Sequence, residues 1–142
     1  MKLYRKKGHI LVVSERSMDL LGLMAGVGKN GKGAAIYPFL FVREESFATP
    51  VLTNHELIHF RQQIETLFIG SWLINLLERQ YAKLFLKKRN MESYTWKSSE
   101  QEAYRNQYDL EYLKNRKLWA RFNYFKNKKK ITFPEPGMIV IE

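Results

Sequence analysis

Apolar residues recur at helical spacing through the middle of the chain. The members of this pattern lie three or four residues apart: Leu57, Phe60, Ile64, Leu67 and Phe68. The spacing predicts a helix that opens at Thr53 and resumes or continues to about Leu86. A later pattern of the same kind, from Ser99 to about Phe125, predicts another long helix.

The regions outside these patterns have the composition of strands, turns and one short helix. His9–Val13 is a short apolar run that predicts a strand, and residues 14–26 predict a short helix capped by Ser14. Residues 34–44 are rich in aromatic and β-branched side chains, which predicts a strand, and Pro38 favours an edge position. Residues 1–142 are therefore expected to form one α+β domain, mainly helical, with a small antiparallel sheet.

The stretch TNHELIHFRQQIE, residues 53–65, contains a candidate metal site. His55 and His59 are four residues apart, so on a helix they project from one face and can bind one ion. Glu56 is rotated by about 100° from His55, from where it can act as a general base toward water. Two structural alternatives remain: Thr53 and Glu56 form a capping-box pattern, and the histidines can be hydrogen-bonded core residues.

A catalytic zinc site needs a third protein ligand and an open position. The chain has no cysteine, so that ligand is a histidine or a carboxylate. Glu65 lies on the same continuing helix and is excluded, and His9 is far upstream beside a strand. Glu100 and Glu102 at the start of the later helix are better placed. Ser99 and Glu102 also form a capping-box pattern, which leaves Glu100 as the preferred ligand.

HELIH followed by EQEAY resembles the gluzincins, zinc peptidases in which a glutamate on a later helix completes the site. The second motif is similar to the E-x-x-A-D signature of CAAX prenyl protease-like peptidases, with Tyr104 where those enzymes carry Asp. More closely, residues 34–118 resemble a family of small bacterial proteins common in Bacteroidetes. The resemblance implies a minimal gluzincin-like core and a zinc-dependent hydrolase, most simply a peptidase.

The same resemblance implies roles for further residues. An edge strand at about 34–43 would lie near the HELIH helix and pair with an extended peptide substrate, with Tyr37, Phe39 and Phe41 as contact candidates; an ordinary core strand is the alternative. Tyr104 is a candidate donor to an oxyanion. The candidates for orienting the ligands are Gln62, Gln63 and Glu102.

The formal net charge of +10 is concentrated after residue 78, where 15 basic residues face 7 acidic ones. Aromatic side chains interleave with this charge: Trp96, Trp119, Phe122, Tyr124 and Phe125. This pattern favours an alternative function, a catalytically silent binding module. Residues 79–130 would then contact nucleic acid, an anionic membrane surface or a protein.

Three further patterns bear on location and ligands. The glycine-rich segment 26–32 resembles part of a phosphate loop, but Gly33 stands where Ser or Thr should follow, so no nucleotide is expected. The apolar run at residues 10–13 is too short for a signal peptide. Residues 67–77 are about half of a membrane span. We expect a cytoplasmic protein, with peripheral membrane contact left open.

Overall fold

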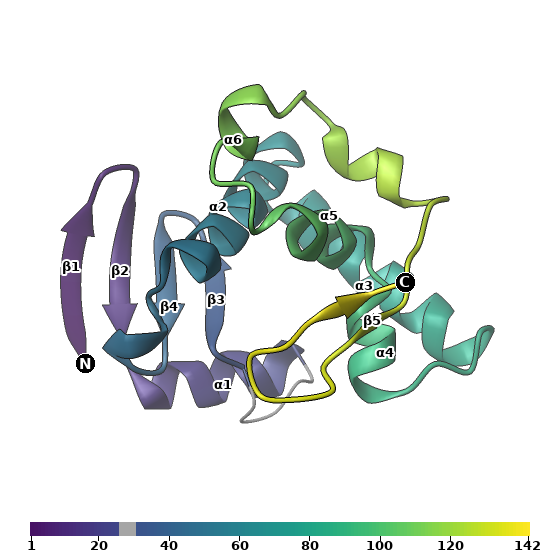
Figure 1. Ribbon diagram of the computed structural model, residues 1–142, viewed down its shortest axis with the longest axis horizontal. Helices are drawn as coiled ribbons and strands as arrows, with labels where there is room; N and C mark the ends of the chain where they lie inside the picture. The colour runs from purple at the N-terminus through teal and green to yellow at the C-terminus, as the bar shows by residue number, and fades with distance from the viewer. Residues whose placement is uncertain (26–30) are drawn as a thin grey trace.

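The computed structural model describes residues 1–25 and 31–142; the phosphate-loop resemblance at 26–32 falls largely outside them. The fold is α+β and mainly helical, as expected (Figure 1). Its four-stranded sheet has the order β1-β2-β4-β3. The strands are β1 (Lys2–Lys6), β2 (His9–Val13), β3 (Gly33–Ile36) and β4 (Phe39–Val42). The sheet is mixed, because β2 and β4 run parallel.

The helices follow the sheet along the chain, except for α1 (Glu15–Ala25), which contacts β3 and β4. A one-turn 3-10 helix, η2 (Glu45–Phe47), leads into the others: α2 (Pro50–Glu65), α3 (Ile69–Leu84), α4 (Asn90–Thr95), α5 (Ser98–Asn106), α6 (Tyr112–Asn115) and the 3-10 helix η3 (Ala120–Tyr124). The tail forms a two-stranded ribbon of β5 (Ile131–Thr132) and β6 (Val140–Ile141). Across the described residues 1–25 and 31–142, no helix is long and apolar enough to cross a bilayer.

The hydrophobic core lies between the sheet and α2. Leu11, Leu40 and Val42 from the two interior strands pack with Phe60 of α2 into one buried cluster. This packing fixes the orientation of α2, so the residues on its remaining faces are directed toward β3 and α5, which it also contacts.

The prediction of one strand over residues 34–44 was wrong. These residues form a hairpin of β3 and β4, joined by a turn at Tyr37 and Pro38. Pro38 does not lie on an edge strand; its carbonyl accepts a hydrogen bond from the amide of Ile10 at 2.9 Å. The predicted strand at residues 9–13 is confirmed, and so is the short helix that follows, where the amide of Ser17 donates to Oγ of Ser14.

The two long helices were predicted with the wrong ends. The first begins at Pro50, because Oγ1 of Thr49 accepts from the amide of Leu52 at 3.2 Å. It ends at Glu65, where Leu67 and Phe68 adopt positive φ values of 52° and 61° and start a separate helix. The second ends at Asn106, because Asn54 donates from Nδ2 to the backbone carbonyls of residues 106, 107 and 109.

Both capping boxes suggested by the sequence are absent. Thr53 lies inside the first turns of α2, so it does not cap the helix, and Glu56 is free of that structural role. Ser99 likewise lies inside α5, which has no side-chain cap, and its hydroxyl donates to Asn75 at 2.7 Å. The structural alternatives for Glu56 and Glu102 at helix starts are thereby removed.

Candidate metal centre

Helix α2 directs both histidines of the HELIH motif to one point. Nε2 of His55 lies 3.2 Å from Nε2 of His59, as one helical turn between the residues requires. His55 is buried and His59 is half-buried. The two imidazole nitrogens therefore face a common position at the protein interior.

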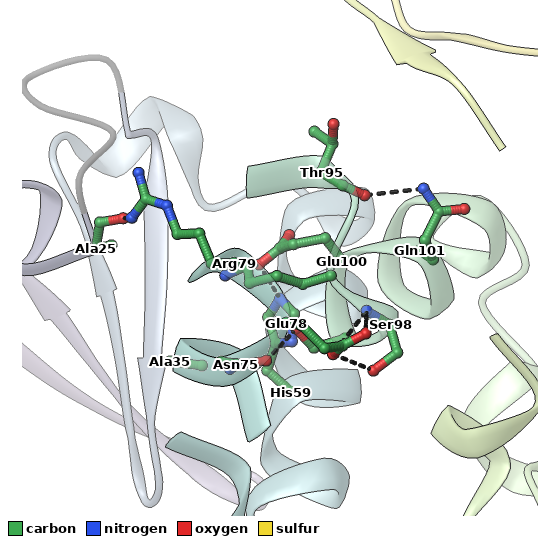
Figure 2. Close-up of polar contacts among 12 residues, drawn as sticks. Ala25, Ala35, His59, Asn75, Glu78, Arg79, Thr95, Ser98, Glu100 and Gln101 are labelled. Carbon is green, nitrogen blue, oxygen red and sulfur yellow. Dashed lines mark hydrogen bonds and ion pairs between the residues drawn. The ribbon is translucent and has the colours of Figure 1, made fainter. Parts of the chain in front are cut away.

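Helix α5 brings Glu100 to the same position. Its two carboxylate oxygens each lie 3.5 Å from one imidazole Nε2, Oε2 from His55 and Oε1 from His59. Figure 2 shows the carboxylate of Glu100 directed toward His59. His55, His59 and Glu100 each offer one ligand atom, and these atoms lie within 4.8 Å of one another.

The spacing of these groups is compatible with three ligands of one metal ion. Ligand atoms about 2.0 to 2.1 Å from a tetrahedral ion are about 3.3 Å apart. The two imidazole nitrogens are 3.2 Å apart, and each lies 3.5 Å from a different oxygen of Glu100; with one atom from each residue, all separations stay within 4.8 Å. Oε2 of Glu100 is also buried without a hydrogen bond and lies 3.5 Å from Nε2 of His55; a bound cation would satisfy this oxygen. The donor set and its spacing fit a metal ion.

The neighbours of Glu100 favour its charged form. Burial by itself raises the pKa of this carboxyl, but His59, Lys97 and His55 outweigh that effect and hold the pKa well below its ordinary value. A carboxylate that stays ionised in a buried position is available as a ligand across the physiological pH range.

Two glutamine side chains set the tautomers of the imidazoles. Oε1 of Gln107 lies 3.1 Å from Nδ1 of His55, and Oε1 of Gln62 lies 2.9 Å from Nδ1 of His59. An amide oxygen only accepts, so each Nδ1 carries a proton, and in the neutral imidazole each Nε2 would offer its lone pair to a metal. Gln62 is a predicted orienting residue. Gln107 was missed, although it lies two helical turns after Glu100.

Glu102 lies outside the group of three possible ligands, and it positions the side chain of Gln62, which contacts His59. It accepts a hydrogen bond from Nε2 of Gln62 at 2.9 Å, which turns the oxygen of that amide toward His59. Arg116 pairs with Glu102 and also with Glu65, which confirms that Glu65 is directed away from the metal position. His9 lies on β2, outside the three-residue group.

Glu56 lies beside the ligands, against the edge strand. It is buried, and burial raises the pKa of its carboxyl to about 7, opposed by His55 and assisted by Glu100. A Cβ atom added to Gly33 of β3 would lie 2.8 Å from Oε1 of Glu56. The glycine is therefore what leaves room for this carboxyl between α2 and β3.

A pocket of about 360 Å³ opens onto the group. It is lined by Glu56, His59 and Glu100, and by α1, β3 and α3 on its other sides. Tyr94 and Lys97, which the sequence did not single out, also line it beside Glu100. Nζ of Lys97 lies 3.5 Å from Oε1 of Glu100 and 3.8 Å over the ring of Tyr94, and burial lowers its pKa.

Tyr104 packs edge-on against His55, with ring centroids 4.6 Å apart. Burial, Glu100 and Glu56 all raise the pKa of its phenol, so the hydroxyl stays protonated and is a donor. Tyr94 has the same property for the same leading cause, burial, and lines the pocket. Two phenols rather than one are thus candidates to donate near the site.

The edge strand is β3, and the predicted contact residues lie elsewhere. Phe39 and Phe41 are on β4, which pairs with β2 on one side and β3 on the other, so this backbone has no free edge for a peptide. Tyr37 lies in the turn and packs against Phe60. Gln63 does not orient a histidine: its side chain donates to the carbonyl of Ala35 at 2.7 Å and accepts from the amide of Tyr37 at 2.9 Å.

As far as the structure describes the β3 edge, only its N-terminal part, beside Glu56, has backbone groups free for a further strand, because Gln63 bonds to the backbone of Ala35 and Tyr37.

The chain has no counterpart among the known proteins that were compared with it: it matches no family model, no curated protein and no solved structure.

Proposed function

We propose that this protein is a zinc-dependent hydrolase that cleaves peptide bonds. The observation that carries the proposal is the convergence of His55, His59 and Glu100 from two helices, with Glu56 beside them at a pocket. Two imidazoles and one carboxylate, with the histidine tautomers set by glutamine oxygens, are the ligand set that zinc hydrolases use. The chain has no cysteine to offer a softer set.

Each residue has a distinct role in the proposed reaction. His55, His59 and Glu100 would hold zinc, which as a Lewis acid polarises a carbonyl and lowers the pKa of water. Glu56 accepts the proton of the attacking water and returns it to the leaving amine. Glu56 is buried beside the ligands and lines the pocket, which is the position that a general base toward the attacking water requires. Tyr94 or Tyr104 donates to the oxyanion of the tetrahedral intermediate.

The proposed substrate is an extended polypeptide. It enters the pocket between α1 and α3 and pairs with the backbone of Gly33, next to Glu56. The side chain of Gln63 limits this pairing, because it already satisfies Ala35 and Tyr37. The free edge is therefore short, and most of the contact with a substrate would come from the pocket.

Glu56→Gln separates metal binding from hydrolysis. We expect the variant to retain zinc, because Glu56 is not a ligand, and to lose at least about a hundredfold in kcat, the usual cost of removing a general base. The measurement is hydrolysis of a quenched-fluorescence peptide library, with zinc content determined on the same sample. Glu135→Gln, a change at an exposed carboxylate, is the control. Equal activity of the wild type and Glu56→Gln would refute the proposed base.

A further inference from the structure

Helix α3 has its polar side turned inward and its apolar side turned outward. Ser71 is buried, Asn75 bonds to Arg121 and Ser99, and Glu78 bonds to Arg121 and Ser98. Figure 2 shows Glu78 and Asn75 directed into this polar cluster. The opposite side of the helix is exposed and apolar; it consists of Ile69, Trp72, Leu73, Leu76, Leu77 and Tyr81, and is called the α3 surface below.

In a typical surface helix of a globular protein, the apolar side faces the core and the polar side faces water, so α3 has the reverse arrangement. The exposed fractions reach 77% for Ile69 and 66% for Trp72. The apolar residues follow the whole helix, which is about 24 Å long at 1.5 Å per residue. Residues 67–68 and 84–86 extend the exposed apolar side at both ends. A continuous apolar surface of this size indicates a binding partner.

The charges beside the α3 surface identify the partner's chemistry. Glu78, the one acidic residue of α3, is directed inward, where it pairs with Arg121 and Lys128. Lys83, Lys87 and Arg89 are exposed along and just after the C-terminal half of the helix. An apolar stripe containing Trp and Tyr and flanked by Lys and Arg is the composition of a helix that lies in the interface of an anionic bilayer.

Two other partners fit less well. A second copy of the chain would carry the same charge of +10, so the two copies would repel each other. Nucleic acid would use the aromatic and basic residues of the 79–130 segment, but several of these are paired internally. Lys128 lies 4.4 Å over the ring of Trp96, Arg105 lies 4.9 Å over Tyr124, and Arg121 is buried.

We propose that the α3 surface docks on an anionic membrane surface, with its apolar side chains among the acyl chains and its lysines at the headgroups. Trp72, on the α3 surface, also lines the pocket of the candidate metal centre, as do the exposed Met24 and Phe68. Docking by this surface therefore turns the pocket toward the bilayer. The docking proposal does not depend on hydrolysis and stands on the helix alone.

Co-sedimentation with vesicles tests the proposal. We expect the zinc-loaded protein to pellet with vesicles of phosphatidylcholine and phosphatidylglycerol, less in high salt, and weakly with phosphatidylcholine alone. The double variant Ile69→Glu/Leu73→Glu should bind about tenfold or more weakly, because charged side chains then replace apolar ones at the lipid. Leu3→Glu/Leu110→Glu is the matched control, since it adds the same charge at exposed leucines outside the α3 surface.

Zinc content and sedimentation equilibrium are measured on every sample. Retained zinc with lost vesicle binding in the Ile69→Glu/Leu73→Glu variant supports docking by α3 and shows that the metal centre is intact. Equal vesicle binding by the two double variants would overturn the proposal. So would a dimer that only Ile69→Glu/Leu73→Glu dissociates, or retention on single-stranded DNA in the absence of vesicle binding.

Discussion

Glu56 is buried beside the ligands of the candidate site. It lies between the buried triad on one side and the backbone of Gly33 on the other, and burial raises the pKa of its carboxyl to about 7. A buried carboxyl of this kind opposes folding when it is ionised and no cation is near. Its surroundings thus favour reactivity at the expense of the stability of the metal-free chain.

Because ionised Glu56 is unfavourable in the folded chain, the stability of the metal-free protein should depend on pH. The pKa rises from 4.5 in the unfolded chain to about 7 in the folded one. The contribution of the Glu56 carboxyl to the free energy of unfolding is fully present below pH 4.5 and is lost as the pH rises through 7. Glu56→Gln should therefore stabilise the metal-free protein at pH 8, by at most about 3 kcal/mol, and little at pH 4. Urea denaturation in the presence of a chelator measures both values, and an equal effect at the two pH values would contradict the assignment.

Gln107 acts on the metal through His55, so its removal should weaken binding without abolishing it. We expect Gln107→Ala to lower zinc affinity about 10- to 100-fold, the usual effect of losing a residue that orients a ligand. Competition with a chromophoric chelator measures the affinity. Gln80→Ala, at an exposed position on α3, is the control. If both variants bind zinc as the wild type does, Gln107 has no orienting role.

The sequence predicts the triad well and its surroundings poorly. His55 and His59 are related by the helical repeat, and the need for a third ligand on another element points to Glu100 or Glu102. The choice of Glu100 relies on a capping box at Ser99 that the structure does not form. Gln107, Tyr94 and Lys97 reach the site through tertiary contacts, and no local spacing pattern marks such residues. Gln63 is predicted as an orienting residue from its position one turn after His59, but its side chain bonds to the backbone of Ala35 and Tyr37 instead.

At the scale of elements, α2 and β3 approach each other closely beside the site. Gly33 leaves space there, because a Cβ atom would lie 2.8 Å from Oε1 of Glu56 and 3.2 Å from a methyl carbon of Leu52, so these side chains would have to move. The strand itself does not need glycine, since β-branched or aromatic residues are favoured in strands. The absence of a side chain at Gly33 instead allows β3 to lie close to α2.

Gly33→Ala should destabilise the protein mainly through Glu56. We expect a loss of unfolding free energy of about 1 to 3 kcal/mol, as for other overpacked contacts, and a smaller loss in a Glu56→Ala background. Denaturation of the wild type, the two single variants and the double variant measures the coupling between the residues. Additive losses would show that Glu56 does not limit the space at Gly33.

The element boundaries could not be predicted from periodicity, and the reasons are specific. Thr49 and Thr53 are both capable caps, and the helix uses Thr49 with Pro50 at its first position, a start signal that the apolar spacing does not carry. The end of α5 is set by Asn54, about fifty residues earlier in the chain. The break at Leu67 and Phe68 needs positive φ values, which are uncommon for such residues and have no sequence signal here.

At the scale of the whole molecule, buried polar contacts connect helices that are distant in the sequence. Arg116 connects α2 to α5 by pairing with Glu65 and Glu102, and Arg121 connects α3 to α5 through Glu78 and Ser98. The triad forms a further link between α2 and α5. The fold class followed from composition and periodicity, whereas this pairing of helices follows from contacts between distant residues.

The central claim, a metal centre formed by His55, His59 and Glu100, is tested most directly by the metal content of the purified chain. We predict about one zinc ion per chain in the wild type, and less than about a tenth of that in His55→Ala, His59→Ala and Glu100→Ala. His9→Ala, at the remaining histidine, should keep the full amount. A wild type without zinc after growth in zinc, or a Glu100→Ala variant that retains it fully, would contradict the account.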